Sequence, residues 1–226
     1  MLQYFQMKPL VAVFAHPDDE AFGPAGTLAL EAKKCDVYLI CVTNGAAGKN
    51  SSRSKKNLAE IRKKELKASA KILGIKKIFF LNYEDGTLCN KIYHELAEKI
   101  EEKLKELKPD TIITFEPCGI SGHIDHIAVS LITTFVFKRL KFINTLLYHC
   151  VDKREGDEFG DSYFIYFPPG YKRSQIDKTV DVSSVWDTKT QAMFAHKSQK
   201  HDAEMILKFR ASRPKEEYFL VEGKRH

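Results

Sequence analysis

The chain has 226 residues, of which 43% are hydrophobic and 29% are charged, and its mean hydropathy is -0.33. This composition is typical of a globular protein with one sizeable core. It excludes a disordered chain and a membrane-spanning one, because no apolar run reaches the roughly 18 residues that a span needs. The net charge of +6, from 36 Lys and Arg against 30 acids, is modest and is spread over scattered lysine pairs, so nucleic-acid binding is not expected.

The cysteines and the N-terminus indicate where the protein works. The five cysteines are odd in number and contain no C-x-x-C pair, which indicates free thiols in a reducing compartment. The N-terminus has no basic segment followed by an apolar stretch, so no secretory leader is expected. These observations predict a cytoplasmic protein. We interpret residues 1–6 as a tag remnant or a disordered start and expect one domain over residues 7–226.

Four strand-loop-helix units follow one another in the first part of the chain. Apolar runs predict buried strands over 10–14, 36–43, 77–81 and 111–115, and helical periodicity predicts helices over 27–34, 58–73, 92–107 and from His123 onward. Such a series is typical of an α/β fold with a Rossmann-like, doubly wound, mostly parallel sheet and helices on both faces. Later strands are expected over 145–151, 163–167, 179–182 and 218–221, and later helices over 186–196 and 202–209.

An acidic turn follows the first predicted strand. His16 is joined there by three carboxylates, which belong to Asp18, Asp19 and Glu20. Like charges at close range raise one another's pKa unless a cation or a proton offsets them. The turn therefore predicts a metal site.

A second polar cluster, His123-Ile124-Asp125-His126, follows the fourth predicted strand. In a doubly wound sheet the first and fourth strands commonly lie side by side, and ligands bind beyond their carboxyl ends. We therefore expect the two clusters to meet. Two His and one Asp would form a hydrolytic zinc site with an open position for water, and the remaining acids and His would move protons. Asp125 is expected on the flank, where it orients an imidazole.

Two other interpretations of these motifs are open. Asp-Asp after a first strand also resembles the phosphoacceptor site of response-regulator receivers, but that site needs an Asp after the third strand, where this chain has Asn82. Two His and one carboxylate also bind iron in non-haem oxygenases, which usually have β-barrel folds. The alternation of strands and helices argues against an oxygenase.

The two clusters together resemble the paired signatures of the LmbE-like or PIG-L family of zinc-dependent N-acetylglucosaminyl deacetylases. The similarity extends over most of the chain, from about Leu10 to Gln199, and includes the Thr43-Asn44-Gly45 turn. It implies that His16, Asp19 and His126 bind Zn²⁺, for which Fe²⁺ is a substitute.

The resemblance also implies the catalytic roles. Asp18 would be the general base. His123 would steady the oxyanion or protonate the leaving amine, and Asp125 would hold His123. One departure concerns Ser121, which stands where some family members have a Tyr that is thought to assist catalysis.

The expected reaction is hydrolysis of the amide of an N-acetylglucosamine conjugate, which releases acetate and a free amino sugar. Arg62, Asp85 and His196 are the candidates for substrate contacts, and the loops over 44–55 and 84–86 are expected at the pocket rim. The alternatives are a zinc amidase on another acylated amine, the iron enzyme, and a sugar-binding protein without catalysis. A glycoconjugate is the expected partner, and a homo-oligomer is a further possibility.

Overall fold

The computed structural model describes residues 7–48, 55–160 and 166–223, and the proposed tag remnant at residues 1–6 lies outside them. The strands are β1 (Leu10–Phe14), β2 (Val37–Thr43), β3 (Lys77–Tyr83), β4 (Thr111–Phe115), β5 (Thr145–Cys150), β6 (Lys178–Asp181) and β7 (Glu216–Gly223). The helices are α1 (Asp19–Phe22), α2 (Ala25–Glu31), α3 (Lys55–Leu73), α4 (Tyr93–Leu107), α5 (Gly119–Gly122), α6 (Ile124–Arg139), α7 (Lys153–Gly160), α8 (Trp186–Ala195) and α9 (Lys200–Arg210).

The strands form one sheet in the order β3-β2-β1-β4-β5-β7-β6. The first five strands are parallel, and β7 runs antiparallel to both β5 and β6. This confirms the predicted doubly wound α/β fold. The strand order reverses between β1 and β4, which are paired in parallel, so the predicted switch point is also confirmed.

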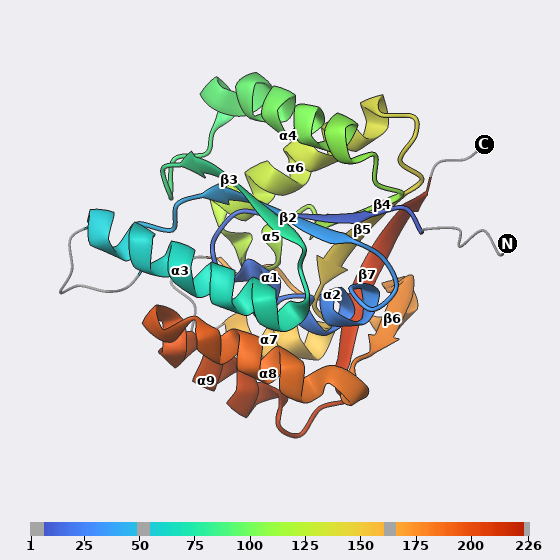
Figure 1. The fold of residues 1–226 in the computed structure, drawn as a ribbon. Coiled ribbons are helices and arrows are strands. Elements are labelled where there is room, and N and C mark those ends of the chain that lie inside the picture. The colour runs from blue at the N-terminus through green and yellow to red at the C-terminus, as the bar shows by residue number, and fades with distance from the viewer. Residues whose placement is uncertain (1–6, 49–54, 161–165, 224–226) are drawn as a thin grey trace, which may run out of the picture.

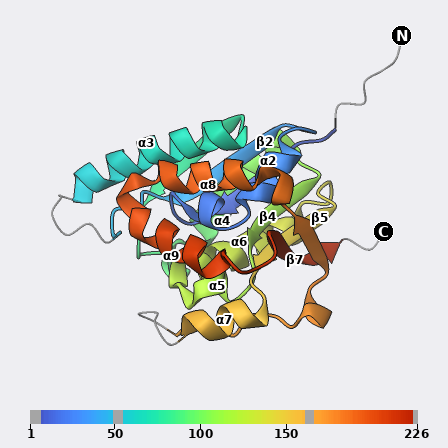
Figure 2. The same ribbon diagram turned by 90° about the horizontal axis from the view of Figure 1, so that it is seen from below.

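Helices cover both faces of the sheet. Figure 1 shows α4 and α6 above it and α2, α3, α8 and α9 below it. Seen from below, α8 lies between α3 and α9, and it contacts both (Figure 2). All five residues of β1 are buried, as expected for a central strand with helices on both faces. The core therefore has two layers, and the sheet lies between them.

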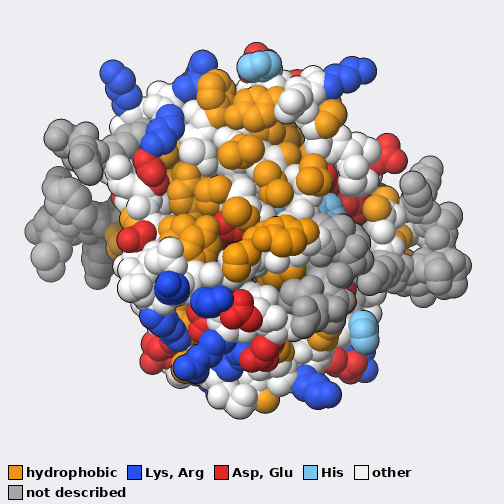
Figure 3. Space-filling view, turned by 180° about the vertical axis from the view of Figure 1, so that it is seen from behind, with side chains coloured by type: hydrophobic (Ala, Val, Ile, Leu, Met, Phe, Trp, Pro, Cys, Tyr) orange, Lys and Arg blue, Asp and Glu red, His pale blue; other side chains and the backbone are white. Residues whose placement is uncertain are grey.

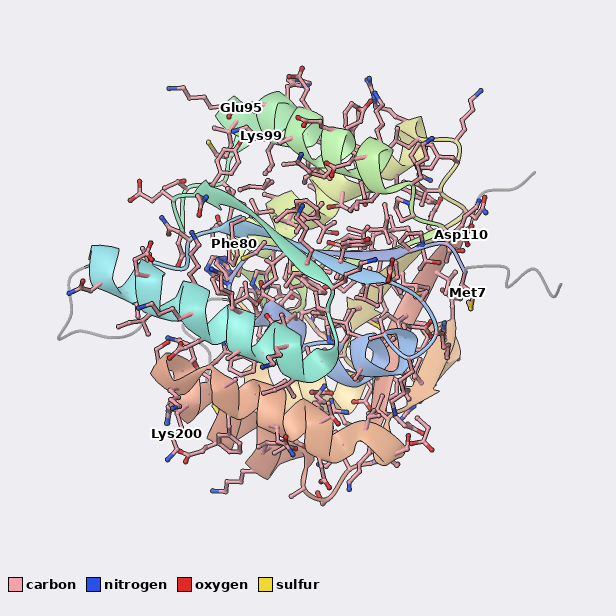
Figure 4. The ribbon with its side chains drawn as sticks, viewed as in Figure 1. Met7, Phe80, Glu95, Lys99, Asp110 and Lys200 are labelled. Carbon is pink, nitrogen blue, oxygen red and sulfur yellow. The ribbon has the colours of Figure 1, made fainter. Side chains whose placement is uncertain are left out.

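The strand β3 at the sheet edge is covered by charged side chains. Glu95 and Lys99 form an ion pair of 2.6 Å on α4, Glu95 accepts a hydrogen bond from the Tyr83 hydroxyl, and Lys99 Nζ lies 4.6 Å from the centre of the Tyr83 ring. Figure 4 shows Glu95 and Lys99 at the end of α4 that lies above this edge, and Phe80 on β3 below them. Charged side chains on an edge strand hinder pairing with another sheet.

The predicted elements differ from the observed ones mainly at their ends. Of the strand expected over 163–167, residues 163–165 lie outside the described part, and Tyr166 and Phe167 are not in a strand.

The exposed side of α6 carries Ile124 and Leu131, whose exposed fractions are 65% and 47%. Hydrophobic side chains also gather over a broad area of the face in Figure 3. Among the described residues, none of the helices has the length and apolar character to cross a membrane.

Candidate metal centre and its pocket

The turn after β1 brings His16 and Asp19 to the same side of the chain. The backbone N–H of His16 donates to Oδ2 of Asp19 at 2.6 Å, which closes the turn just before α1 begins. Asp18 lies at the bend with φ 141° and ψ -23°, a conformation that residues with a Cβ rarely adopt. The carboxyl end of β1 thus presents one imidazole and two carboxylates to the switch point.

The loop after β4 fixes the ring of His126. Glu116 accepts hydrogen bonds from the backbone N–H groups of Cys118 and Ile120, which hold the loop in shape. The carbonyl oxygen of Gly119 in this loop lies 3.0 Å from Nδ1 of His126, and the Phe115 ring stacks on the imidazole at a centroid distance of 4.1 Å. Nδ1 therefore carries the proton, and Nε2 is left with its lone pair.

Three potential ligand atoms meet at the switch point. Nδ1 of His16 lies 3.0 Å from Nε2 of His126, and the Asp19 carboxylate lies 3.6 Å from the first atom and 3.3 Å from the second. Nε2 of His16 lies 3.0 Å from Asp85 and 3.3 Å from Asp125, so both imidazoles have their far nitrogen engaged. Such outer partners orient the histidine ligands of metal ions, so this donor set fits a divalent cation.

Two other groups of side chains could also bind a metal ion, and one of them includes His123. His16, His123 and His126 have ligand atoms within 4.8 Å of one another, and so do His16, Asp85 and Asp125. We favour the set with Asp19. The carboxylates of Asp85 and Asp125 contact the far nitrogen of His16. Nδ1 of His123 accepts a hydrogen bond from the backbone N–H of Asp125. Nε2 of His123 therefore carries the proton of the neutral ring.

The electrostatics of this cluster call for a positive charge. Burial opposes protonation of His16, but the carboxylates of Asp125, Asp19 and Asp85 outweigh burial and hold its pKa well above the usual value. Burial likewise opposes ionisation of Asp19, yet the two imidazoles hold its pKa well below its usual range. The acids thus stay charged, and a proton on His16 or a bound cation offsets them.

Asp18 is held by Arg62, which comes from a distant part of the chain. Nη2 of Arg62 donates to Oδ2 of Asp18 and to the carbonyl oxygen of Pro17, and Nη1 donates to the carbonyl oxygen of Gly45. Gly45 has φ 68°, and a Cβ there would lie 2.8 Å from Nη1 of Arg62, so glycine is needed at this position. Burial raises the pKa of Asp18 to about 6, although Arg62 pulls it down.

Two of the predicted site residues have partners that the sequence did not reveal. Asp125 was expected to hold His123, but its carboxylate contacts His16 and accepts hydrogen bonds from the backbone of Gly86 and Leu88. His196 was a candidate for substrate contact. The structure contradicts this substrate contact, because the exposed fraction of His196 is 0% and its Nε2 lies 2.8 Å from Glu20.

Glu20, the third carboxylate of the acidic turn, contacts other parts of the chain. Its carboxylate also accepts hydrogen bonds from the hydroxyl of Ser69 and the backbone N–H of Asp18, so His196 acts on the turn through Glu20. Arg62 and Asp85 line the pocket as predicted, but each already contacts protein groups. Their contacts with a sugar stay a prediction.

The site opens into a cavity of about 420 Å³. Its lining includes His16, Asp18, Asp19, His123 and His126, which we call the metal end, and it also includes Ala47, Gly48 and Asp85 from the loops expected at the rim. That size lies within the range of about 300–1,000 Å³ that is usual for small-molecule sites.

The sequence did not single out three further lining residues, His149, Glu155 and Arg210. A signal for His149 was present. It lies near the carboxyl end of the fifth predicted strand, at the same sheet edge as the two clusters.

The fold and this site define a class: a doubly wound α/β protein with a candidate His/Asp metal site at the switch point. The sequence model of the PIG-L family, described as GlcNAc-PI de-N-acetylase, matches residues 11–137. A Bacillus cereus protein named probable N-acetyl-alpha-D-glucosaminyl L-malate deacetylase 2 is 31% identical over 196 residues, which cover 84% of this chain and 83% of that protein. The chain belongs to the PIG-L family, as its two signatures predict.

Two solved structures show the same fold. N,N'-diacetylchitobiose deacetylase from Pyrococcus horikoshii aligns with 96% of this chain and 84% of its own at a TM-score of 0.73 and 23% identity. GalB, a 4-carboxy-2-hydroxymuconate hydratase from Pseudomonas putida, aligns with 97% of this chain and 98% of its own chain. The TM-score is 0.73 and the sequence identity is 16%. Because the second protein is named as a hydratase, the fold alone does not decide the reaction.

Proposed function

We propose that this chain is a Zn²⁺-dependent amide hydrolase that removes the N-acetyl group from an N-acetylglucosamine conjugate. The observation that carries the proposal is the meeting of His16 Nδ1, His126 Nε2 and the Asp19 carboxylate, with Asp18 and His123 beside them. The family match and the names of the relatives support the choice of substrate.

His16, Asp19 and His126 hold the metal in this proposal, and Fe²⁺ is the substitute. When bound, the ion supplies a Lewis acid that polarises the acetyl carbonyl and makes water more acidic. Asp85 and Asp125 orient His16 from its far nitrogen, and the Gly119 carbonyl does the same for His126. These partners keep the donor atoms in place before the substrate arrives.

Asp18 accepts the proton of the attacking water. Its pKa of about 6 suits a base that works near neutral pH, and a divalent cation nearby would lower this value. Arg62 fixes the orientation of the carboxylate by holding Oδ2 at 2.7 Å. The same carboxyl group can pass the proton on as the C–N bond breaks.

His123 stabilises the charge that develops on the acetyl oxygen. Because its Nδ1 accepts the backbone N–H of Asp125, the proton of the neutral ring is on Nε2 and is available as a hydrogen-bond donor. Burial and the two neighbouring imidazoles lower the pKa of His123, which favours this neutral form. Water adds to the carbonyl carbon, the amide bond breaks, and acetate and a free amine leave.

The other candidate functions are less well supported. An iron oxygenase is disfavoured because the sheet is open and doubly wound, whereas such sites usually lie in β-barrels. A sugar-binding protein without catalysis would have no evident use for Asp18 and His123 beside the metal donors. Five free thiols support the proposed cytoplasmic location, and assembly into a homo-oligomer stays a prediction.

The test is amine release from a panel of N-acetylglucosamine conjugates by protein loaded with Zn²⁺ under anaerobic conditions. We expect one equivalent of acetate for each amine, and no turnover after chelation. Turnover that needs iron and oxygen would favour the oxygenase. No amine release from any acylated amino sugar would overturn the proposal.

A further inference from the structure

The cavity has a second wall, built by a later part of the chain than the metal site. Its lining includes His149, Glu155, Asp202, Met205, Ile206 and Arg210, which we call the C-terminal wall. The family model matches residues 11–137, so these residues lie beyond the matched segment, whereas the proposed metal ligands lie within it. A conjugate has two parts, the acetylated sugar that reacts and the group attached to it. The C-terminal wall lines the same cavity as the proposed metal ligands.

His149 offers this wall a neutral polar group. Its exposed fraction is 7%, and its Nδ1 is buried without a hydrogen-bond partner among the described residues. Gly23 also lines the cavity, and a Cβ at that position would lie 3.3 Å from this nitrogen. Burial lowers the pKa of His149 to about 3, so the imidazole is uncharged near neutral pH. A neutral ring nitrogen suits a hydroxyl group as its partner.

The single cation of the C-terminal wall is already neutralised. Nη1 of Arg210 lies 3.1 Å from each carboxylate oxygen of Glu155, and Nη2 donates to the carbonyl oxygen of Glu216. Asp202 also lines the cavity, so this wall carries two carboxylates and one guanidinium. A carboxylate on the ligand would find no unpaired positive charge in this described wall and would be repelled by the acids.

We propose that the C-terminal wall is a second subsite, which binds an uncharged, hydroxyl-bearing group such as a second sugar and disfavours a carboxylate. This inference rests on the proposed deacetylase function. His149 hydrogen-bonds a hydroxyl of the attached group, and Met205 and Ile206 pack against its apolar face. The Bacillus cereus relative carries L-malate in its name. The inference therefore gives this chain a different preference for the attached group from the one in that name.

The first test compares three compounds with the Zn²⁺-loaded wild-type protein. These are N-acetylglucosamine, N,N'-diacetylchitobiose and the L-malate conjugate of N-acetylglucosamine. We expect kcat/KM to be about threefold to tenfold higher for the disaccharide than for the free sugar, as one buried hydrogen bond would give. We expect the malate conjugate to do no better than the free sugar.

The outcomes of this comparison are distinct. A malate conjugate that is hydrolysed as well as or better than the disaccharide overturns the inference and leaves the proposed function intact. No hydrolysis of any of the three compounds overturns the proposed function and the inference with it.

The second test frees the positive charge. In Glu155→Gln, Arg210 loses its ionic partner, so kcat/KM for the malate conjugate relative to the disaccharide is expected to rise about tenfold. Glu158→Gln is the matched control, because Glu158 lies on the same helix and pairs with Arg213 at the surface. An unchanged ratio in folded Glu155→Gln protein would contradict the inference.

The third test removes Nδ1 of His149, and it does not depend on the folding of the Glu155 variant. His149→Phe keeps a ring of similar size, and the ratio of kcat/KM for disaccharide to free sugar is expected to fall towards one. His94→Phe, at an exposed site on α4, serves as control and should keep the wild-type ratio. Retention of the full ratio in His149→Phe would remove His149 from the subsite.

Discussion

The proposed metal ligands and base of the cavity are held differently from the polar atoms of its C-terminal wall. At the metal end the polar atoms of His16, His126 and Asp18 are held by carboxylates, a backbone carbonyl and a guanidinium. On the C-terminal wall, His149 Nδ1 and Arg210 Nε are buried without hydrogen-bond partners among the described residues. The proposed ligand and base atoms are therefore fixed in advance by protein partners, whereas His149 Nδ1 has none. Arg62 Nε and Ser121 Oγ also line the cavity without partners among the described residues, so the contrast concerns individual atoms and not whole walls.

Backbone strain is found beside the metal end. Asp18 has φ 141° and Ile120 has φ 62°, both unusual for residues with a Cβ. In each case a nearby carboxylate accepts the backbone N–H of the strained residue: Glu20 for Asp18 and Glu116 for Ile120. Such strain costs about 1–3 kcal/mol per residue and persists only where the surroundings enforce it. The strain and its supports indicate that this end is rigid before the ligand binds.

The largest expected effect is the loss of a proposed metal ligand. In His126→Ala we expect loss of bound zinc by elemental analysis and a fall in kcat of roughly 10³-fold or more, because a bound metal typically stabilises the transition state by several kcal/mol. His94→Ala, at an exposed site, is the control. Unchanged zinc content in His126→Ala would remove this residue from the ligand set.

A variant of Asp18 separates metal binding from proton transfer. Asp18→Asn keeps the shape of the side chain, so zinc should stay bound while kcat falls by about 10²–10⁴-fold. Asp36→Asn removes a carboxylate that pairs with Lys76 at the surface, and it should leave kcat unchanged. Near-wild-type turnover of Asp18→Asn would show that the base is another group.

A buried ion pair of the C-terminal part lies against the backbone of residues 23–27. Nζ of Lys189 lies 2.7 Å from Glu217 and also donates to the Gly23 carbonyl, and both charged side chains are 1% exposed. Lys189→Met leaves Glu217 unpaired, so the free energy of unfolding should fall by about 3–5 kcal/mol in urea titration.

The control for this prediction is an exposed ion pair. Lys138→Met breaks the contact with Glu222, which is 39% exposed, and should cost less than about 1 kcal/mol. Equal losses in the two variants would mean that burial does not set the strength of the Lys189–Glu217 pair.

The smallest predicted effect is a pH dependence of stability from the C-terminal wall. The pKa of His149 is about 3 in the folded protein and about 6.5 when unfolded, so its contribution is complete above pH 6.5 and is lost as the pH falls towards 3. At pH 4 the loss should be about 3 kcal/mol. In His149→Phe the free energy of unfolding should fall less between pH 7 and pH 4, and parallel pH profiles would contradict the buried neutral imidazole.

Local patterns in the sequence were sufficient to predict the sheet and the position of the reaction site. The apolar runs at β1 and β4 mark buried strands, and right-handed crossovers place these two strands side by side. The motifs at their carboxyl ends then had to meet, so His16 and His126 lie together although they are 110 residues apart. These features follow from periodicity and chain topology, which a single sequence records.

The partner of each polar atom was decided only by the tertiary structure. The carboxylate of Asp125 contacts His16 rather than holding His123 as predicted, and the buried His196 contacts Glu20. The C-terminal wall likewise needs β5, α7 and α9 to be placed around one cavity. Residue spacing determines which sheet edge or helix face a side chain occupies. Its nearest partner depends on how separate elements pack, and that information is distributed over the whole chain.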